Sequence, residues 1–181
     1  DVVVPPRGWR PAQPLLMQAH AAGLPIWSDI ELAWRVRERA GRKVADWICL
    51  TGTNGKTTTV SMVEAILRAD GRRAIACGNV GTPVLDAVRD PEGFDVLALE
   101  LSSFQLHWTH HIEPASSAVL NIAEDHVDWH GSMDGYVRDK GSVYENTRIA
   151  CVFNEAAPIT RRLVEQADVQ EGCRAVSFST D

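Results

Sequence analysis

Short runs of consecutive apolar residues alternate along most of this chain with longer stretches in which apolar and polar residues mix. The runs have the length of strands that are buried on both faces of a sheet. They predict strands at Trp47–Leu50, Ala74–Cys77, Phe94–Leu99, Ala115–Ile122, Ile149–Phe153 and Ala175–Phe178. The mixed stretches predict helices at Lys56–Ala69, Pro83–Arg89, Met133–Glu145 and Ala156–Ala167. Because strand and helix alternate, the pattern predicts an α/β fold with a mostly parallel sheet and flanking helices.

The residues before Trp47 follow a less regular pattern. Val2–Val4 is a β-branched run, Pro14–Ala22 has the composition of a helix, and Leu24–Trp27 is another short apolar run. The chain opens at Asp1, directly before the first of these runs, as if in the middle of a strand. We therefore expect a segment of a longer protein that begins with part of another domain.

A second helix is predicted to begin after Ser28, because Ser28 stands three residues before Glu31 in the pattern of a capping box. The helix continues into the basic stretch Arg35–Arg39 and stops at Gly41. Cations suit the C-terminal end of a helix, and phosphate binding by this stretch is the less favoured alternative. The polar residues 40–46 then predict a linker.

The composition excludes several classes of protein. The chain has 18 Lys and Arg against 24 Asp and Glu, a net charge of −6, so a basic surface for nucleic acid is not expected. Hydrophobic residues make up 45%, which is ordinary for a folded domain, and no apolar run approaches the length needed to cross a bilayer. The cysteines have no paired spacing, which predicts reduced thiols rather than disulfides or a zinc site. They are Cys49, Cys77, Cys151 and Cys173.

A glycine turn with the composition of a phosphate-binding loop lies between the first predicted strand of the sheet and the helix that follows it. Glycines let successive amide N–H groups point at phosphate oxygens, and the start of a helix adds the positive end of its dipole. Lys56 can reach the β- and γ-phosphates, and Thr57 can bind Mg²⁺. The spacing G-x-x-G-K-T is shorter than the usual G-x-x-x-x-G-K-[ST], and a glycine turn with an incidental lysine is the alternative. The predicted nucleotide-binding residues are Gly52, Thr53, Asn54, Gly55, Lys56, Thr57 and Thr58.

Acidic residues and histidines follow two of the predicted strands. Glu100 comes directly after a buried strand and is placed to hold Mg²⁺ beside the phosphate loop, the alternative being a solvated strand end. His126 lies among acids after the next strand, which makes it a candidate ligand to a nucleotide-associated metal. With His130, four residues on, it has the spacing of a zinc pair on a helix, a less favoured alternative. Three further histidines form a cluster, for which a structural role is the favoured interpretation. They are His107, His110 and His111.

Lys140 lies on the predicted helix Met133–Glu145. Its spacing alone favours the interpretation that it is an exposed helix lysine. Its surroundings nevertheless complete a series of motifs that occur in order along the chain. The motifs are Thr51–Thr57, Gly78–Gly81, Leu99–Leu106, Asn121–His126 and Tyr136–Asn146. Together they resemble the Mur ligases, which are ATP-dependent, amide-bond-forming enzymes of peptidoglycan precursor synthesis. The stretch Leu99–Leu106 is most similar to the members that add D-glutamate.

The resemblance covers nearly the whole chain and implies three domains in the complete protein. Residues 1–42 would be the end of a Rossmann-like N-terminal domain that binds the UDP-linked substrate. Residues 43–181 would be most of the central ATP-binding domain, which carries the phosphate loop. The C-terminal domain would be absent. One departure is visible, because Pro5–Gly8 replaces the Ser-Pro-Gly that the family usually carries after its N-terminal valine run.

The resemblance also implies a role for each matching residue. The loop Gly52–Thr58 would bind the ATP phosphates, and Lys140 matches a lysine that the family carbamylates with CO₂. Mg²⁺ would be held by Thr57, Glu100, His126 and the carbamate of Lys140. The UDP-muramoyl substrate would face Asn79, Ser102 and Gln105. The residues expected to serve catalysis are Lys56, Lys140, His126 and Glu100.

The implied reaction joins UDP-N-acetylmuramoyl-L-alanine to D-glutamate. The substrate carboxylate attacks the γ-phosphate of ATP, and the amine of D-glutamate then displaces phosphate from the acyl phosphate. The resemblance implies a monomer in the bacterial cytoplasm. Alternatives are another Mur-type ligase, an enzyme like folylpolyglutamate synthase, or, for this chain by itself, a module that binds ATP and Mg²⁺ without turnover.

Overall fold

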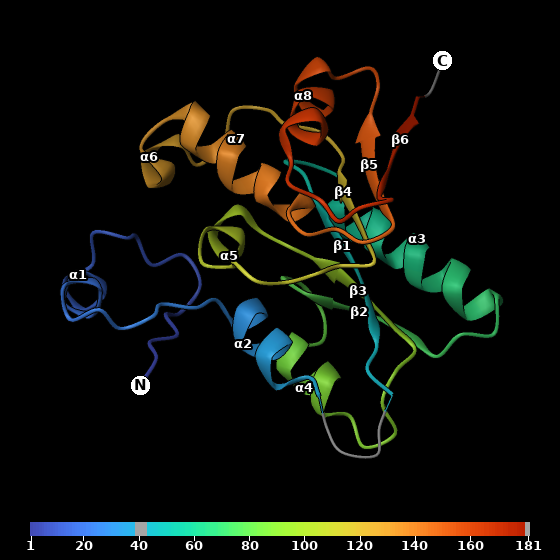
Figure 1. Ribbon diagram of the computed structural model, residues 1–181, viewed down its shortest axis with the longest axis horizontal. Coiled ribbons are helices and arrows are strands. Elements are labelled where there is room, and N and C mark those ends of the chain that lie inside the picture. The colour runs from blue at the N-terminus through green and yellow to red at the C-terminus, as the bar shows by residue number, and fades with distance from the viewer. Residues whose placement is uncertain (39–42, 180–181) are drawn as a thin grey trace.

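The computed structural model describes residues 1–38 and 43–179. Its central feature is a six-stranded sheet with the strand order β2-β3-β1-β4-β5-β6 (Figure 1). All five pairs of neighbouring strands are parallel, which confirms the predicted α/β class. The strands are β1 (Asp46–Thr51), β2 (Ala74–Gly78), β3 (Val96–Glu100), β4 (Ser116–Val119), β5 (Ala150–Asn154) and β6 (Arg174–Phe178).

The register of the sheet brings several predicted site residues to one edge. Glu100, the last residue of β3, lies opposite Leu50 of β1 and opposite Gly78 of β2. Thr51 of β1 lies opposite Val119 of β4. In a parallel sheet the carboxyl ends of all strands meet at the same edge, and ligands bind there where the strand order reverses. Here β1 is followed in sequence by strands on one side and then by strands on the other, so the reversal lies at β1.

Helices cover both faces of the sheet. The helix α3 packs against β1, β2 and β3, whereas α2 and α4 pack against each other and α5 packs against α7 (Figure 1). The helices are α1 (Pro14–Ala21), α2 (Asp29–Val36), α3 (Lys56–Ala69), α4 (Val84–Arg89), α5 (Ser103–His107), α6 (Val127–His130), α7 (Met133–Gly141) and α8 (Pro158–Gln166). A 3₁₀ turn, η1 (Ser142–Tyr144), follows α7. Among the described helices none is long and apolar enough to cross a membrane.

The strands bury both of their faces, as the continuous apolar runs predict. On one face Val60 of α3 packs against Leu50 and Ala98. On the other face a larger cluster joins the sheet to α2, α4, α5 and η1, and it includes Ile30, Leu106 and Tyr144. Burial of this apolar area from water is the main force that fixes the phosphate-loop strand in the middle of the molecule.

The first residues of the chain form a small cluster of their own. Leu16, Ala19 and Ile26 are buried together, with Trp9 and Trp108 against them. The short runs Val2–Val4 and Leu24–Trp27 meet in a single isolated bridge, in which Val3 pairs with Ile26. By contrast, α2 buries its apolar side in the main core. The predicted domain boundary between residues 42 and 43 falls at the edge of residues 39–42, which lie outside the described residues. The predicted basic end of the second helix, at Arg39 and Gly41, also lies outside them.

The predicted capping box of α2 forms only in part. The Ser28 hydroxyl oxygen accepts from the Glu31 amide at 3.0 Å, as predicted. The Glu31 side chain, however, is fully buried and accepts from the backbone amides of His110 and His111 at 2.9 and 3.0 Å. Because these loop amides need an acceptor, the carboxylate satisfies them in place of its own helix start. Glu31 thereby ties α2 to the loop that follows α5.

Two predicted elements end differently from the observed ones, and two observed helices were not predicted. The strand predicted at Ala115–Ile122 is shorter, since residues after Val119 leave the sheet to meet the phosphate loop. The helix predicted at Met133–Glu145 ends at Gly141 and continues as η1. Two short helices, α5 and α6, were not predicted, because four or five residues are too few to show helical periodicity.

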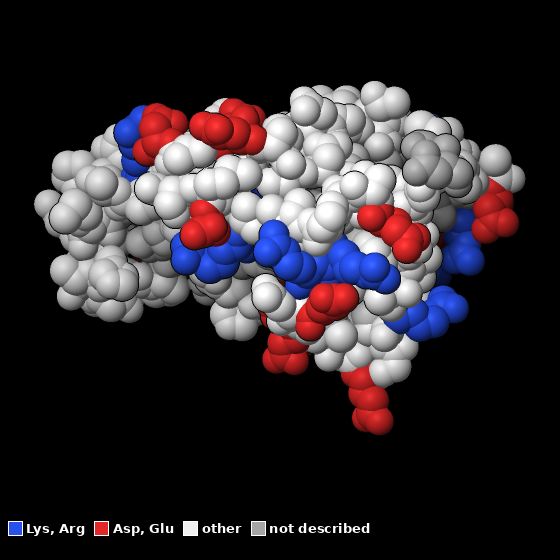
Figure 2. All heavy atoms as spheres, turned by 90° about the horizontal axis from the view of Figure 1, so that it is seen from above, with Lys and Arg blue, Asp and Glu red and all other residues white. Residues whose placement is uncertain are grey.

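Charges are mixed over the surface rather than separated. On the face seen in Figure 2, a row of basic side chains is flanked by acidic ones. Exposed pairs such as Arg161 and Glu165 of α8, 3.8 Å apart, show the same mixing. The net charge of −6 therefore does not produce a field of one sign on this face.

Candidate functional site

The phosphate loop connects β1 to α3 through a tight turn. Gly55 has φ +80°, a left-handed conformation that glycine adopts without strain, and it stands directly before the first residue of α3. At Gly52 a Cβ atom would lie 3.1 Å from the Cβ of Leu120, so the loop passes close to the chain after β4. The turn directs the first amides of α3, which have no acceptor within the helix, toward the carboxyl edge of the sheet.

The Asn121 side chain braces this loop. Its Oδ1 accepts from the amides of Thr53 and Asn54 at 3.1 and 2.9 Å, and its Nδ2 donates to the Asn54 carbonyl at 3.0 Å. The Thr53 hydroxyl, in turn, lies 3.0 Å from the hydroxyl of Tyr136 on α7. The conformation of the loop is therefore set by residues that follow it by some seventy positions or more.

Two lysines meet over the loop. Lys56 donates through Nζ to the carbonyl oxygens of Gly52 and Thr53, each at 2.9 Å. Lys140 donates to the same Gly52 oxygen at 2.8 Å and to the Thr51 hydroxyl at 3.3 Å. Lys140 is only 2% exposed. The prediction of an exposed lysine, which its spacing alone favoured, is therefore wrong.

The Lys140 ammonium is in an unfavourable place. Burial, and after it the charge of Lys56, lowers the pKa of Lys140 to about 7, although Asp125 opposes the shift. Since an unperturbed lysine titrates near 10.4, a substantial fraction of this amine is unprotonated at neutral pH. An unprotonated amine is a nucleophile, whereas an ammonium is not.

A buried carboxylate lies beside the start of α3. Glu100 is 1% exposed, accepts from the Thr57 hydroxyl through Oε2 at 2.8 Å, and accepts from the Asn79 amide through Oε1 at 3.1 Å. Both partners are neutral, and a buried carboxylate with neutral partners is stabilised by a cation. The solvated strand end, the alternative for Glu100, is therefore excluded by its burial.

A cavity of about 150 Å³ opens at this edge. Its lining brings together six of the predicted site residues, from five different segments of the chain. They are Thr53, Lys56, Asn79, Ser102, His126 and Lys140. His126 reaches the cavity from a left-handed backbone position, φ +49°, at the start of α6, and its Nε2 lies 3.3 Å from Asp125. Residues far apart in sequence thus form one polar site.

Gln105 is placed differently from Ser102. Its Oε1 accepts from the Ser102 amide at 3.0 Å, which completes a capping box at the start of α5. Its Nε2 donates to Asp29 at 3.0 Å, and Gln105 does not line the cavity that Ser102 lines. The side chain is instead buried between α5 and the start of α2.

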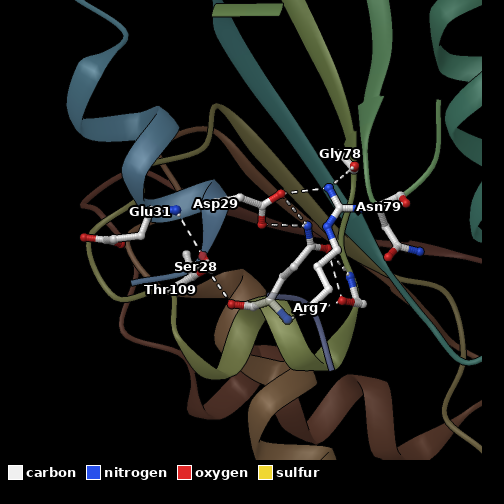
Figure 3. A network of polar contacts seen from close by, with 9 residues as sticks. Arg7, Ser28, Asp29, Glu31, Gly78, Asn79 and Thr109 are labelled. Atoms are coloured by element: carbon white, nitrogen blue, oxygen red, sulfur yellow. Dashed lines mark hydrogen bonds and ion pairs between the residues drawn. The ribbon is translucent and has the colours of Figure 1, made fainter. Parts of the chain in front are cut away.

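Arg7 links the start of α2 to the site, a connection that sequence reasoning did not predict. Its guanidinium lies between three acceptors: Asp29 Oδ2 at 2.7 Å and the carbonyl oxygens of Gly78 and Asn79 at 2.9 and 2.8 Å (Figure 3). Arg7 belongs to the Pro5–Gly8 stretch that departs from the family pattern. The departure therefore falls on a residue that holds the backbone beside Asn79.

The histidines do not form the zinc pair that was weighed. Both ring nitrogens of His130 are engaged elsewhere, Nδ1 with Asp139 at 2.7 Å and Nε2 with Ser103 at 3.0 Å. His107 joins the same carboxylate at 2.8 Å. Within the described residues, His107, His130 and Asp139 are a set of three potential metal ligands that lie close together.

The structure also accounts for the basic stretch after α2 and for the cysteines. Arg35 pairs with Glu31, and Arg37 lies over the Trp34 ring, so the described part of the basic stretch is used in local contacts. All four cysteines are free thiols, as predicted.

A comparison with protein-family models matches residues 50–181 to the Mur ligase middle domain. The chain belongs to the Mur ligase family. The matched region begins in β1 and contains the phosphate loop and every residue that lines the cavity. The expected fold and family are therefore confirmed.

Curated relatives from this family are similar over almost all of the chain. A protein named UDP-N-acetylmuramoylalanine–D-glutamate ligase from Streptomyces coelicolor is 54% identical over 99% of the chain. One of the same name from Leifsonia xyli is 52% identical over all of it. The chain spans only 38% and 37% of the lengths of these two relatives.

Solved Mur ligase structures have the same fold. A UDP-N-acetylmuramoyl-L-alanyl-D-glutamate–2,6-diaminopimelate ligase matches 92% of this chain and 43% of its own, with a TM-score of 0.67 and 19% identity. A MurF ligase from Thermotoga maritima, in complex with ADP, matches 92% of this chain and 44% of its own, with a TM-score of 0.65 and 19% identity. At such identities the likeness establishes the fold alone.

Proposed function

We propose that this chain is the nucleotide-binding part of an ATP- and Mg²⁺-dependent ligase that adds D-glutamate to UDP-N-acetylmuramoyl-L-alanine in peptidoglycan precursor synthesis. The names of two relatives that match nearly the whole chain support this pair of substrates. One observation carries the proposal furthest: Lys56, Lys140 and His126 line one cavity, and Asn79 connects it to the Glu100–Thr57 pair.

The residues present suit Mg²⁺. This ion prefers oxygen ligands and usually keeps several waters, so one carboxylate and one hydroxyl from the protein suffice beside substrate phosphates. Glu100 and Thr57 provide these groups 2.8 Å apart, and Thr57 and Asn79, whose side chains donate to the buried Glu100 carboxylate, are both neutral. His126 and the modified Lys140 would hold a second ion across the cavity. The ions would neutralise charge on the transferred phosphoryl group.

Carbamylation of Lys140 would resolve its burial. The unprotonated Nζ would attack CO₂ and release a proton, which replaces a buried cation with an anion that can accept from Lys56. The pKa of about 7 makes the nucleophilic amine available at neutral pH. The product would carry oxygen atoms suited to a hard cation.

In the reaction, the residues of this chain mainly position groups and neutralise charge. The amides of the loop and Lys56 would bind the ATP phosphates while the carboxylate of the L-alanyl end attacks the γ-phosphorus. ADP leaves, and the amine of D-glutamate then displaces phosphate from the acyl phosphate. Asn79 and Ser102 would orient the UDP-linked substrate from the far side of the cavity, with Gln105 fixing Ser102.

Residues 1–42 would belong to the domain that binds the UDP-linked substrate, and residues 43–181 to the ATP-binding domain. We further propose a monomeric enzyme of the bacterial cytoplasm. For the isolated chain, which spans 38% of its relative's length, we propose binding of ATP and Mg²⁺ without turnover.

Phosphate release by the full-length protein tests the reaction. We expect release that requires both UDP-N-acetylmuramoyl-L-alanine and D-glutamate, and no release with L-glutamate or diaminopimelate. Equal rates with another amino acid would refute the D-glutamate assignment while leaving the ligase class in place. Lys140→Ala should remove the activity, and short added carboxylates should restore part of it. Full activity of this variant without any addition would refute the carbamate.

A further inference from the structure

Two of the free thiols lie in contact near the β6 edge of the described sheet. The Sγ atoms of Cys151 and Cys173 are 3.8 Å apart, although 22 positions separate the two residues in sequence. Cys151 belongs to β5 and lies opposite Ala175 of β6, and Cys173 stands two residues before Ala175, directly ahead of β6. Side chains two residues apart along a strand point to the same side of a sheet, so the register brings the two thiols together.

The remaining two cysteines provide a contrast within the same molecule. Cys49 of β1 and Cys77 of β2 both lie opposite Leu99 of β3, one on each side of it. They are therefore separated by two strand spacings, about 9–10 Å. Cysteines whose Cα atoms are more than about 7 Å apart cannot be joined without movement of the backbone. Among the four cysteines, Cys151 and Cys173 are therefore the two that are placed to be joined.

Cys173 is the thiol of this pair that a reagent in solution can reach. Its side chain is half-buried, whereas Cys151 is 1% exposed. Cys173 follows Gly172, which has φ +87° and open space around it, and lies between a turn and the first residue of β6. The two Sγ atoms need to approach by less than about 2 Å to reach the length of a disulfide bond. The turn can supply this movement more easily than the interior of a strand.

The surroundings of Cys151 keep its thiol protonated. Burial raises the pKa of Cys151 to about 11, against the opposing effect of a hydrogen bond from the Ser117 hydroxyl. Because the thiolate is the form that reacts with an oxidant, Cys151 is a poor first target at neutral pH. Cys173 is then the first target of a peroxide, and Cys151 is the neighbouring thiol that can complete a disulfide.

We propose that Cys173 and Cys151 are a peroxide-sensitive pair that forms a reversible disulfide and thereby fastens the start of β6 to β5. In the first step Cys173 Sγ bonds to one peroxide oxygen, the O–O bond breaks, and the second oxygen leaves as water with the thiol proton. In the second step Cys151 Sγ attacks the sulfur of the resulting sulfenic acid. The S–O bond breaks, and the departing hydroxide takes the Cys151 proton to form water. Two electrons thus pass from the two thiols to one peroxide molecule.

The disulfide would act on a strand at the edge of the described sheet. Within the described residues β6 pairs with β5 alone, and all five of its residues are exposed. Weakly held elements open locally before the core does, so a covalent bond beside the first residue of β6 would oppose that opening. This inference does not depend on the proposed ligase function.

Peptide mapping of the folded full-length protein tests the pair. The protein would be treated with hydrogen peroxide, its remaining thiols alkylated, and its digest analysed by mass spectrometry with and without dithiothreitol. We expect a cross-linked peptide that joins Cys151 to Cys173, about 2 Da lighter than the sum of its reduced halves, which disappears on reduction. Cys173→Ser should abolish the link, and Cys49→Ser, the matched control, should leave it intact.

Two further measurements separate the steps. Cys151→Ala should leave Cys173 as a sulfenic acid that dimedone labels, and if this variant fails to fold, Cys173→Ser decides. The amides of Arg174–Phe178 should exchange with deuterium at least about threefold more slowly in the oxidised protein than in the reduced one. Oxidation of Cys173 to a sulfinic acid without any link, or links mainly to Cys49 or Cys77, would overturn the pair. Equal exchange in both redox states would overturn the fastening of β6.

Discussion

Lys56 and Lys140 donate to the same atom, the carbonyl oxygen of Gly52, at 2.9 and 2.8 Å. Two ammonium groups on one oxygen repel each other, and Lys140 is almost fully buried as well. The arrangement is favourable only if an anion arrives or one lysine loses its proton. The protein thus holds positive charge in excess at the point where its predicted ligand is most negative.

The stability of the chain should depend on pH through Lys140. Its pKa is about 7 in the folded state, whereas the unfolded value is near 10.4, so above pH 7 the unfolded chain binds more protons. The free energy of unfolding should therefore rise from pH 7 toward pH 10, by at most about 1.4 kcal/mol per pH unit. Urea unfolding at pH 7 and 9 measures this slope. Lys140→Met should flatten it, and equal slopes in both proteins would contradict the shifted pKa.

Replacement of Lys56 should remove most of the affinity for nucleotide. Lys56→Ala takes away the cation next to the predicted β- and γ-phosphates, and we expect Kd for ATP with Mg²⁺ to rise at least about 100-fold, about 2.7 kcal/mol. Isothermal titration calorimetry on the chain gives this value. Lys43→Ala is the control, since Lys43 is exposed and pairs with Asp95 away from the site. An unchanged Kd in Lys56→Ala would mean that the loop does not bind phosphate.

Gly78 should tolerate no side chain. It has φ +107°, and a Cβ there would lie 2.5 Å from the carbonyl oxygen of Glu100. Gly78→Ala should lower the unfolding free energy by at least about 2 kcal/mol, because conformational strain and displacement of β3 add. Gly71→Ala has a similar φ with open space around it, so it should cost only about 1 kcal/mol. Urea unfolding compares the two, and equal losses would show that the contact with Glu100 is irrelevant.

The contacts of Arg7 should contribute more to stability than the nearby ion pair of Arg10 with Asp128. Arg7 makes three hydrogen bonds to Asp29 and to the backbone of Gly78 and Asn79. Arg7→Ala should cost about 1–2 kcal/mol, whereas Arg10→Ala, which breaks an exposed pair with Asp128, should cost less than about 1. A double-mutant cycle of Arg7 with Asp29 should give a coupling above about 0.5 kcal/mol. No coupling would place the contribution of Arg7 elsewhere.

Local features of this molecule were predictable from sequence, and features made by distant residues were not. The start of α3 at Lys56 and its end at Ala69 follow from glycine, lysine and apolar spacing within one segment. The burial of Lys140 depends instead on β1 and the phosphate loop, nearly ninety residues earlier, so only the family resemblance indicated it. The spacing of Lys140 on its own helix predicted the opposite, an exposed side chain.

The contacts of Arg7 and Asp139 show the same limit. Arg7 was visible as a departure from the family pattern, but two of its acceptors, the carbonyl oxygens of Gly78 and Asn79, are 71 and 72 residues away, at the end of β2. Asp139 pairs with His130 across the break between α6 and α7, and α6 is too short to be read from spacing. A histidine followed nine positions later by an aspartate has no periodic relation, so this pair could only be found in three dimensions.

The brace that Asn121 forms has a thermodynamic consequence. A loop that is free before it binds must lose conformational entropy on binding, and that loss weakens its affinity. Here the amides of Thr53 and Asn54 are already held in place, so the loop is ordered when the chain folds. Binding of a triphosphate would then involve little change in backbone entropy, and its heat would report mainly the exchange of water for protein around the phosphates.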